Sequence, residues 1–162
     1  MDIKNLSKDF GVEINNFDCS KEIKFDEIEF LKKTMQDKHF ICFKKQNLDG
    51  NSLAKFTKNF GDLEAYPEKD KTKGKIEIFN VSNVSEDGEH LSPNDHRVIL
   101  QKNNSRWHTD SSYRYYPSIF SILYGQETLP IEAKGGQTEF SNMLLAYENL
   151  SDNKKQLLKP LH

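Results

Sequence analysis

The sequence predicts an α+β fold, and three observations support this prediction. Segments with helical spacing of apolar residues gather in the first part of the chain, short apolar runs bounded by glycine turns follow them, and no internal repeat is present. Such an order is typical of a β-sandwich or barrel covered by early helices. Because 162 residues is the usual size of one domain, we expect residues 1–162 to form a single domain.

Two amphipathic helices are predicted in the first part of the chain. Residues 25–37 carry one apolar face at helical spacing, made of Phe25, Ile28, Leu31 and Met35. Residues 49–61 form the second helix, with Asp49 and Ser52 as candidate N-caps and Gly61 as the stop. Both helices are expected to cover the core with their apolar faces.

The strands are predicted from short aromatic and β-branched runs. These runs lie at residues 39–44, 76–81, 118–125 and 135–140, the last of them opening on the glycine pair of "GGQTEF". A polar loop, residues 82–96, follows the second run. A loop of this length inside a domain is more often functional or mobile than inert. Two more helices follow, capped by Ser141 and Ser151, before Pro160 interrupts.

Composition excludes several classes of function. The net charge is -2 with both signs interspersed, which offers no basic field for nucleic acid. No apolar stretch is long enough to span a membrane, and the first residues lack the pattern of a signal peptide. We therefore expect a cytoplasmic protein whose two cysteines, Cys19 and Cys42, stay reduced and take no part in chemistry.

The stretch "RWHTDSSYRYYP" contains the strongest candidate for chemistry. On a strand, residues two apart point to the same face with α-carbons ~6.6 Å apart, so His108 and Asp110 would converge while Thr109 faces away. One imidazole and one carboxylate are two of the three ligands of the facial site that holds non-haem Fe(II). A polar patch at a strand edge is the alternative, because a His-x-Asp tripeptide arises readily by chance.

The neighbours of this motif have ordinary interpretations beside functional ones. Trp107 is expected to pack beneath the motif strand, and the arginines Arg106 and Arg114 either attract an anionic substrate or are simply solvated. The tyrosines that follow line either a pocket mouth or the core; they are Tyr113, Tyr115 and Tyr116. The other histidines are expected to be a strand-end residue, His39, and two surface residues, His90 and His96.

Longer motifs give the chain a family resemblance. "WHTDSSY", the later "GGQTEFSNMLLAYENL" and the earlier "HFICFKKQNLDGNSLAKFTKNFGDLE" together resemble the taurine and phenoxyacetate dioxygenase family of Fe(II)- and 2-oxoglutarate-dependent oxygenases. The resemblance covers essentially the whole chain. The serine pair after the aspartate is more similar to the phenoxyacetate branch of the family than to the taurine branch. It implies a double-stranded β-helix, or jelly roll, with covering N-terminal helices and with its C-terminal strands absent from these residues.

The resemblance also implies roles for individual residues. His108 and Asp110 match the iron ligands, Thr138 matches a donor to a carboxylate of 2-oxoglutarate, and Asn104 matches a position that faces the substrate. Gly135 and Gly136 would allow a tight turn. The implied reaction uses Fe(II), 2-oxoglutarate and O2, hydroxylates a small anionic sulfonate or carboxylate such as taurine or a phenoxyacetate, and produces succinate and CO2.

The sequence departs from the family pattern at its end. The family's third ligand is a distal histidine followed by a 2-oxoglutarate-binding arginine, and His162 lies too near His108 to be that ligand. We therefore expect these residues to be the N-terminal portion of an oxygenase. Alone they should show little enzymatic turnover, and the edges of their sheet should be open or covered by another chain. The alternatives are a non-catalytic binding module and an interaction partner that associates with a complementary or full-length chain or forms a homo-oligomer.

Overall fold

The computed structural model describes residues 1–64, 66–67, 75–76, 78–85, 87–130 and 132–161. By its contacts the chain divides into two compact units. Unit 1 consists of Met1–Asn47 and Gly125–His162, and unit 2 consists of Leu48–Tyr124. Helices and a small mixed sheet are both present, as the α+β prediction requires, whereas the single-domain boundary stays a prediction.

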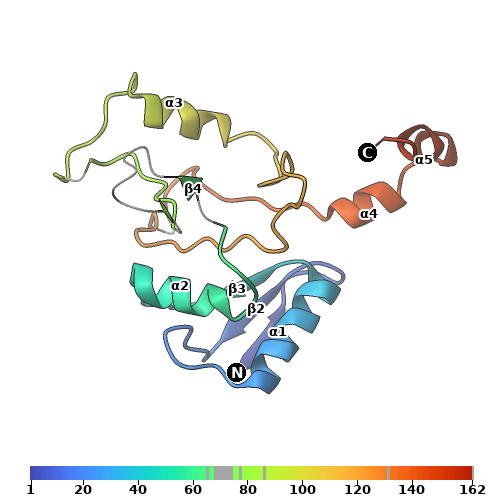
Figure 1. The fold of residues 1–162 in the computed structure, drawn as a ribbon, viewed down its shortest axis with the longest axis horizontal. Helices are drawn as coiled ribbons and strands as arrows, with labels where there is room; N and C mark the ends of the chain where they lie inside the picture. Colours follow the sequence, from blue (N-terminus) through green and yellow to red (C-terminus); the bar gives the residue numbers. More distant parts are fainter. Residues whose placement is uncertain (65, 68–74, 77, 86, 131, 162) are drawn as a thin grey trace. The chain divides into compact units, whose positions relative to one another are not determined.

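Unit 1 is built on a three-stranded mixed sheet with one helix beside it (Figure 1). The central strand β2 pairs antiparallel with β1, where Ile3 faces Ile14, and parallel with β3, where Ile14 faces Phe43. The elements are β1 (Asp2–Asn5), β2 (Val12–Asn15), α1 (Phe25–Lys38) and β3 (Ile41–Phe43). The sequence predictions did not include β1 and β2, and β3 is shorter than the predicted run 39–44.

The core of unit 1 lies between α1 and the sheet. Val12 and Ile14, two apart on β2, share a face and are buried, and Leu31 of α1 is buried as well. Phe25, predicted on the same apolar face, is instead 78% exposed. A three-residue strand spans roughly 10 Å and a 14-residue helix roughly 21 Å, so the sheet is too short to cover the whole length of α1, and Phe25 at its first position stays exposed.

The ends of α1 show why the chain turns at His39. At the start, the Glu27 carboxylate accepts a hydrogen bond of 3.0 Å from the Lys24 N–H. At the end, His39 adopts the left-handed conformation (φ 62°), and its N–H donates to the Met35 carbonyl. His39 is therefore the helix C-cap and not the strand-end residue predicted from the sequence.

The second half of unit 1 is helical where the sequence predicts helices and lacks the predicted strand. Helices α4 (Met143–Glu148) and α5 (Asp152–Leu158) are present, but the side chain that caps α4 is that of Asn142 rather than Ser141. The predicted turn at the glycine pair is present, with left-handed conformations at Gly135 and Gly136, but the strand predicted to follow it is irregular and no described strand pairs with it. The ring of Phe140 instead stacks on that of Phe40, with centroids 4.1 Å apart.

Among its described residues, unit 2 contains two helices and one pair of short antiparallel strands. The elements are α2 (Gly50–Lys58), β4 (Tyr66–Pro67), β5 (Lys75–Ile76) and α3 (His96–Asn103). Of the predicted strand 76–81, Ile76 is in a strand and residues 78–81 are not, whereas residue 77 lies outside the described residues. The predicted strand 118–125 is irregular. The helix α3 was not predicted; it begins where the Asp95 carboxylate accepts a hydrogen bond from the Arg97 N–H.

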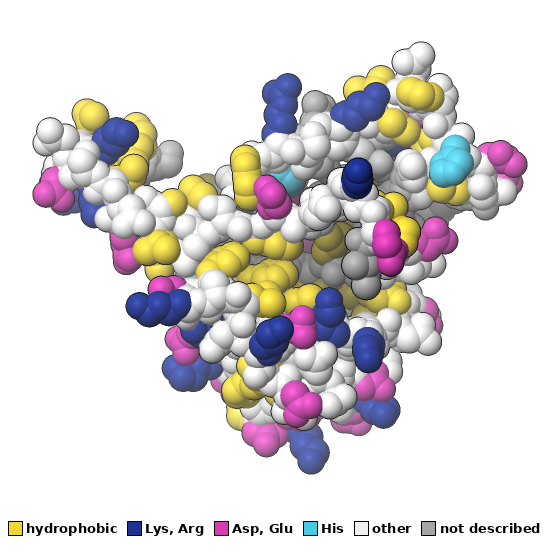
Figure 2. All heavy atoms as spheres, turned by 180° about the vertical axis from the view of Figure 1, so that it is seen from behind, with side chains coloured by type: hydrophobic (Ala, Val, Ile, Leu, Met, Phe, Trp, Pro, Cys, Tyr) yellow, Lys and Arg dark blue, Asp and Glu magenta, His cyan; other side chains and the backbone are white. Residues whose placement is uncertain are grey.

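Large apolar side chains remain at the surface of both units, and Figure 2 shows many of them on one face. Of the helices in the described ranges, none is both long and apolar enough to cross a membrane.

Burial raises the pKa of the Cys19 thiol to about 12, with the nearby Asp18 charge adding to the effect. A thiol with so high a pKa is a poor nucleophile.

The N-cap of α2 predicts a pH dependence of that helix. Hydrogen bonds from the Ser52 hydroxyl and the Ser52 N–H lower the pKa of Asp49. A carboxyl group with a lowered pKa in the folded state stabilises the fold above its unfolded pKa, near 4, and loses that effect as the pH falls through the folded value. The protection of the α2 amides against hydrogen exchange, relative to their intrinsic exchange rate at each pH, should therefore fall below about pH 4 in the wild type.

An Asp49→Asn variant is the control for this prediction. Asparagine caps helices about as well as aspartate but carries no titrating carboxyl group. Its α2 amides should show no such acid-induced step when hydrogen exchange is measured from pH 6 to pH 2. An identical acid response in the two proteins would contradict the assigned role of Asp49.

Candidate functional site

The His-Thr-Asp segment lies after α3 and is not a strand. Residues 107–109 are irregular, and Asp110 begins a turn closed by a 3.0 Å hydrogen bond from the Arg114 N–H to the Ser111 carbonyl. The predicted strand is therefore wrong at this position. The physical reason is Ser111, whose left-handed backbone (φ 55°) cannot continue an extended chain.

The structure nevertheless brings the two candidate ligands together. His108 Nε2 and Asp110 Oδ1 lie 3.4 Å apart, and the other ring nitrogen, Nδ1, lies 2.7 Å from the Arg106 carbonyl oxygen. A carbonyl oxygen only accepts, so Nδ1 must carry a proton and donate to it. This contact fixes the ring orientation and turns Nε2 toward the carboxylate.

The donor set fits a divalent transition metal. If Nδ1 is the only protonated ring nitrogen, Nε2 presents its lone pair to a carboxylate, and two acceptors that face each other need a proton or a cation between them. Two ligand atoms each bound about 2.0–2.2 Å from one cation are at most about 4.4 Å apart, and 3.4 Å lies inside that limit. Imidazole and carboxylate are also the ligand types of non-haem Fe(II) sites.

The described part of the chain does not complete a metal site. Among these residues there is no group of three or more His, Cys, Asp or Glu side chains placed to hold one ion. His108 and Asp110 are about half exposed, at 47% and 62% of their side-chain surface, so further ligands have access to them. His162, rejected as a ligand from the sequence, lies outside the described residues.

The other two predicted site residues are placed as follows. Asn104 is the C-cap of α3 in unit 2, four residues before His108, and it is exposed. Thr138 is exposed on an irregular segment of unit 1, between the glycine turn and α4. Gly135 (φ 95°) and Gly136 (φ 75°) have the left-handed conformations that the predicted tight turn requires.

The aromatic residues around the motif are not core residues. Trp107 is 68% exposed, so the prediction that it packs beneath a strand is wrong, because there is no strand for it to pack against. The three tyrosines are exposed as well, at 78% for Tyr113, 90% for Tyr115 and 84% for Tyr116. The Tyr115 and Tyr116 rings contact each other edge to face, with centroids 4.8 Å apart.

Sequence reasoning missed the most connected polar residue near the motif, Glu64. Its carboxylate accepts hydrogen bonds from Ser111 and Ser118 and forms an ion pair with Arg114. Arg114 is therefore a half-buried structural residue rather than a solvated one. No local pattern around "GDLE" indicates these contacts, because the partners lie 47 to 54 residues further along the chain.

Comparison with known proteins gives consistent matches. The model of the family described as "Taurine catabolism dioxygenase TauD, TfdA family" matches residues 2–162. An alpha-ketoglutarate-dependent 2,4-dichlorophenoxyacetate dioxygenase of Burkholderia sp. (strain RASC) is 28% identical over 156 residues, which are 94% of this chain and 52% of the relative. An (S)-phenoxypropionate/alpha-ketoglutarate-dioxygenase of Sphingobium herbicidovorans is 30% identical over 75% of this chain and 38% of its own length.

A solved structure supports the same grouping. AAD-2, crystallised with Mn(II) and N-oxalylglycine, matches with a TM-score of 0.78 and 25% identity over 98% of this chain and 54% of that chain. The class of protein that these relatives define is the alpha-ketoglutarate-dependent dioxygenases, which are enzymes. Within this class, the chain belongs to the taurine catabolism dioxygenase TauD, TfdA family. It spans about half the length of the curated relatives it matches.

Proposed function

We propose that this chain supplies His108 and Asp110 as Fe(II) ligands of a 2-oxoglutarate-dependent dioxygenase. The observation that carries the proposal is the 3.4 Å separation of His108 Nε2 and Asp110 Oδ1 in a member of this family. With Fe(II), 2-oxoglutarate and O2 bound, the site would hydroxylate a C–H bond of the substrate and release succinate and CO2.

The chain's own residues would bind and orient the reactants. The Arg106 carbonyl holds the His108 ring with Nε2 available, and the exposed Asp110 carboxylate supplies an oxygen beside it. Thr138 would donate its hydroxyl hydrogen to a carboxylate of 2-oxoglutarate, and Asn104 would face the substrate. The support for these two roles is the match of "GGQT" and of the position four residues before His108 to the family's motifs.

The substrate class in this proposal is a small anionic organic molecule. The curated relatives are named for 2,4-dichlorophenoxyacetate and (S)-phenoxypropionate, and the family description names taurine, a sulfonate. A carboxylate or sulfonate attached to a small organic body is common to all three.

The proposal also includes a cytoplasmic location, which the two free cysteines support. It further includes a double-stranded β-helix fold, with residues 1–162 as part of a single oxygenase domain.

The test is a turnover assay with a matched pair of variants. The protein is incubated with Fe(II), 2-oxoglutarate, O2 and either 2,4-dichlorophenoxyacetate or taurine, and succinate is measured. In a protein that carries these residues at the full length of the relatives, we expect succinate to rise with one of the two substrates, to be lost in the His108→Ala variant, and to be retained in a His90→Ala variant. His90 is an exposed histidine on a loop of unit 2, so the control removes the same chemical group.

Two results would contradict the proposal. One is a His108→Ala variant that produces succinate at the wild-type rate. The other is an oxygenase that produces succinate with neither substrate and does not consume 2-oxoglutarate. For the 162-residue chain alone we expect little succinate, because its described residues present two candidate ligands and no third.

A further inference from the structure

A cluster of polar side chains in unit 2 includes Ser111, the residue that follows the His-Thr-Asp segment. We call Glu64, Ser111, Arg114 and Ser118 the Glu64 cluster. Glu64 Oε2 accepts hydrogen bonds from Ser111 Oγ, at 2.6 Å, and from Ser118 Oγ, while Oε1 pairs with the Arg114 guanidinium. The Glu64 side chain is 21% exposed, far less than His108 or Asp110. The cluster is therefore partly buried, whereas His108 and Asp110 are about half exposed.

Ser111 connects this cluster to the ligand pair. It is 5% exposed and has a positive φ of 55°, which is costly for a residue with a Cβ atom. Such a conformation persists only where surrounding contacts hold it. The contacts here are the Ser111 hydroxyl on Glu64 and the Ser111 carbonyl, which accepts a hydrogen bond of 3.0 Å from the Arg114 N–H.

Ser111 follows Asp110 in the chain. The fixed conformation of Ser111 therefore limits the positions that the Asp110 backbone, and with it the Asp110 carboxylate, can take. On the other side, the Arg106 carbonyl holds the His108 ring. We propose that Glu64 is a positioning residue for the metal ligands, acting through Ser111 on Asp110. This proposal rests on the proposed function of His108 and Asp110 as metal ligands.

The carboxylate of Glu64 is specifically suited to this position. Two hydroxyl donors and one guanidinium converge on it, and an ionised carboxylate accepts through both oxygens. Glutamine has nearly the same shape, but one of its two ends is a donor and it carries no charge. At least one of the three donors would then face an N–H group, so Glu64→Gln should loosen the turn at residues 111–114 while keeping the volume of the residue 64 side chain.

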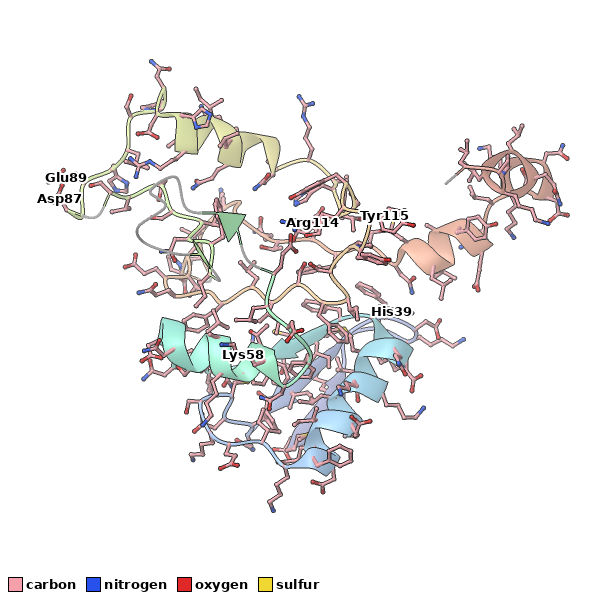
Figure 3. The ribbon with its side chains drawn as sticks, viewed as in Figure 1. His39, Lys58, Asp87, Glu89, Arg114 and Tyr115 are labelled. Carbon is pink, nitrogen blue, oxygen red and sulfur yellow. The ribbon has the colours of Figure 1, made fainter. Side chains whose placement is uncertain are left out.

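The first measurement uses the metal-free chain. Hydrogen exchange at the amides of residues 111–114 should be faster in Glu64→Gln than in the wild type. The matched control is Glu89→Gln, since Glu89 is exposed on the loop before α3, away from Arg114 (Figure 3). Glu89→Gln should leave the exchange of residues 111–114 unchanged, and a Ser111→Ala variant should behave like Glu64→Gln.

The second measurement is a titration with Co(II), followed by NMR shifts of the His108 ring. Loss of an outer partner of a metal ligand typically lowers affinity about 10- to 100-fold, and we expect a loss in this range for Glu64→Gln and no loss for Glu89→Gln. Both effects together support the proposal. Faster exchange with unchanged Co(II) affinity would overturn it, since Glu64 would then have only a structural role, and unchanged exchange would overturn it as well.

The two proposals fail in distinguishable ways. If Co(II) does not shift the His108 ring in the wild-type chain, the ligand assignment is wrong and the positioning role is overturned with it, even if Glu64→Gln accelerates exchange. If Co(II) shifts the ring in the wild type and binds Glu64→Gln equally well, the ligand assignment stands and only the positioning role is overturned.

Discussion

Replacing Ile14 by alanine should lower the free energy of unfolding by about 2–5 kcal/mol, the usual range for truncating a fully buried isoleucine. Ile14 is 0% exposed at the centre of the only three-stranded sheet in the described residues. It pairs with Ile3 on one side and Phe43 on the other, and Leu31 of α1 is buried in the same unit. The cavity left by alanine would be surrounded on several sides and could not collapse easily.

The measurement is urea unfolding followed by circular dichroism, with Ile3→Ala as the matched control. Ile3 lies directly opposite Ile14 in the antiparallel register but is 48% exposed, on the edge strand β1. Removing the same atoms there should cost much less. Equal losses of stability in the two variants would show that Ile14 is not the centre of the core.

The sequence predicted elements well where one local signal determines the structure. The helix α2 is an example, because the predicted N-cap Asp49 does accept a hydrogen bond from the Ser52 N–H. Leu31 was placed correctly on the buried face of α1 by its spacing, whereas Phe25 was not. Spacing tells which side of a helix a residue is on, but the length of the opposing sheet decides how much of that side is covered.

Strand predictions failed because a strand depends on a partner. Residues 118–125 and 135–140 have the composition of strands but pair with no described segment. Composition reports how well side chains fit a pleated surface, and it does not report whether the neighbouring strand is present. The short β1, with only four mostly polar residues, formed for the opposite reason, since β2 lies beside it.

The proximity of His108 and Asp110 was predicted for a partly incorrect reason. Strand geometry predicted that His108 and Asp110 share a face, and the structure brings them together through an irregular segment that ends in a left-handed serine. Glu64, which holds that serine, was not predicted because its contacts are distant in sequence. The residue types of a site are visible in the sequence, whereas the residues that support it become visible only in three dimensions.

Replacing Asp110 by alanine should have the largest effect on metal binding. The carboxylate is one of two candidate ligands in the described residues, so its loss should lower the Co(II) affinity by more than the roughly 10- to 100-fold expected for an outer partner. We expect no measurable Co(II) shift of the His108 ring in Asp110→Ala. The control is Asp87→Ala, because Asp87 is an exposed aspartate on the loop before α3 (Figure 3).

This experiment separates a metal site from a simple ion pair. If His108 and Asp110 form only an imidazolium–carboxylate pair, Co(II) has no specific place between them, and the wild type and Asp110→Ala will show equally weak shifts. If they are ligands of one ion, the wild type will show a saturable shift and Asp110→Ala will not. An Asp110→Asn variant sharpens the distinction, because it keeps the shape of the side chain while removing the negative charge that a divalent cation requires.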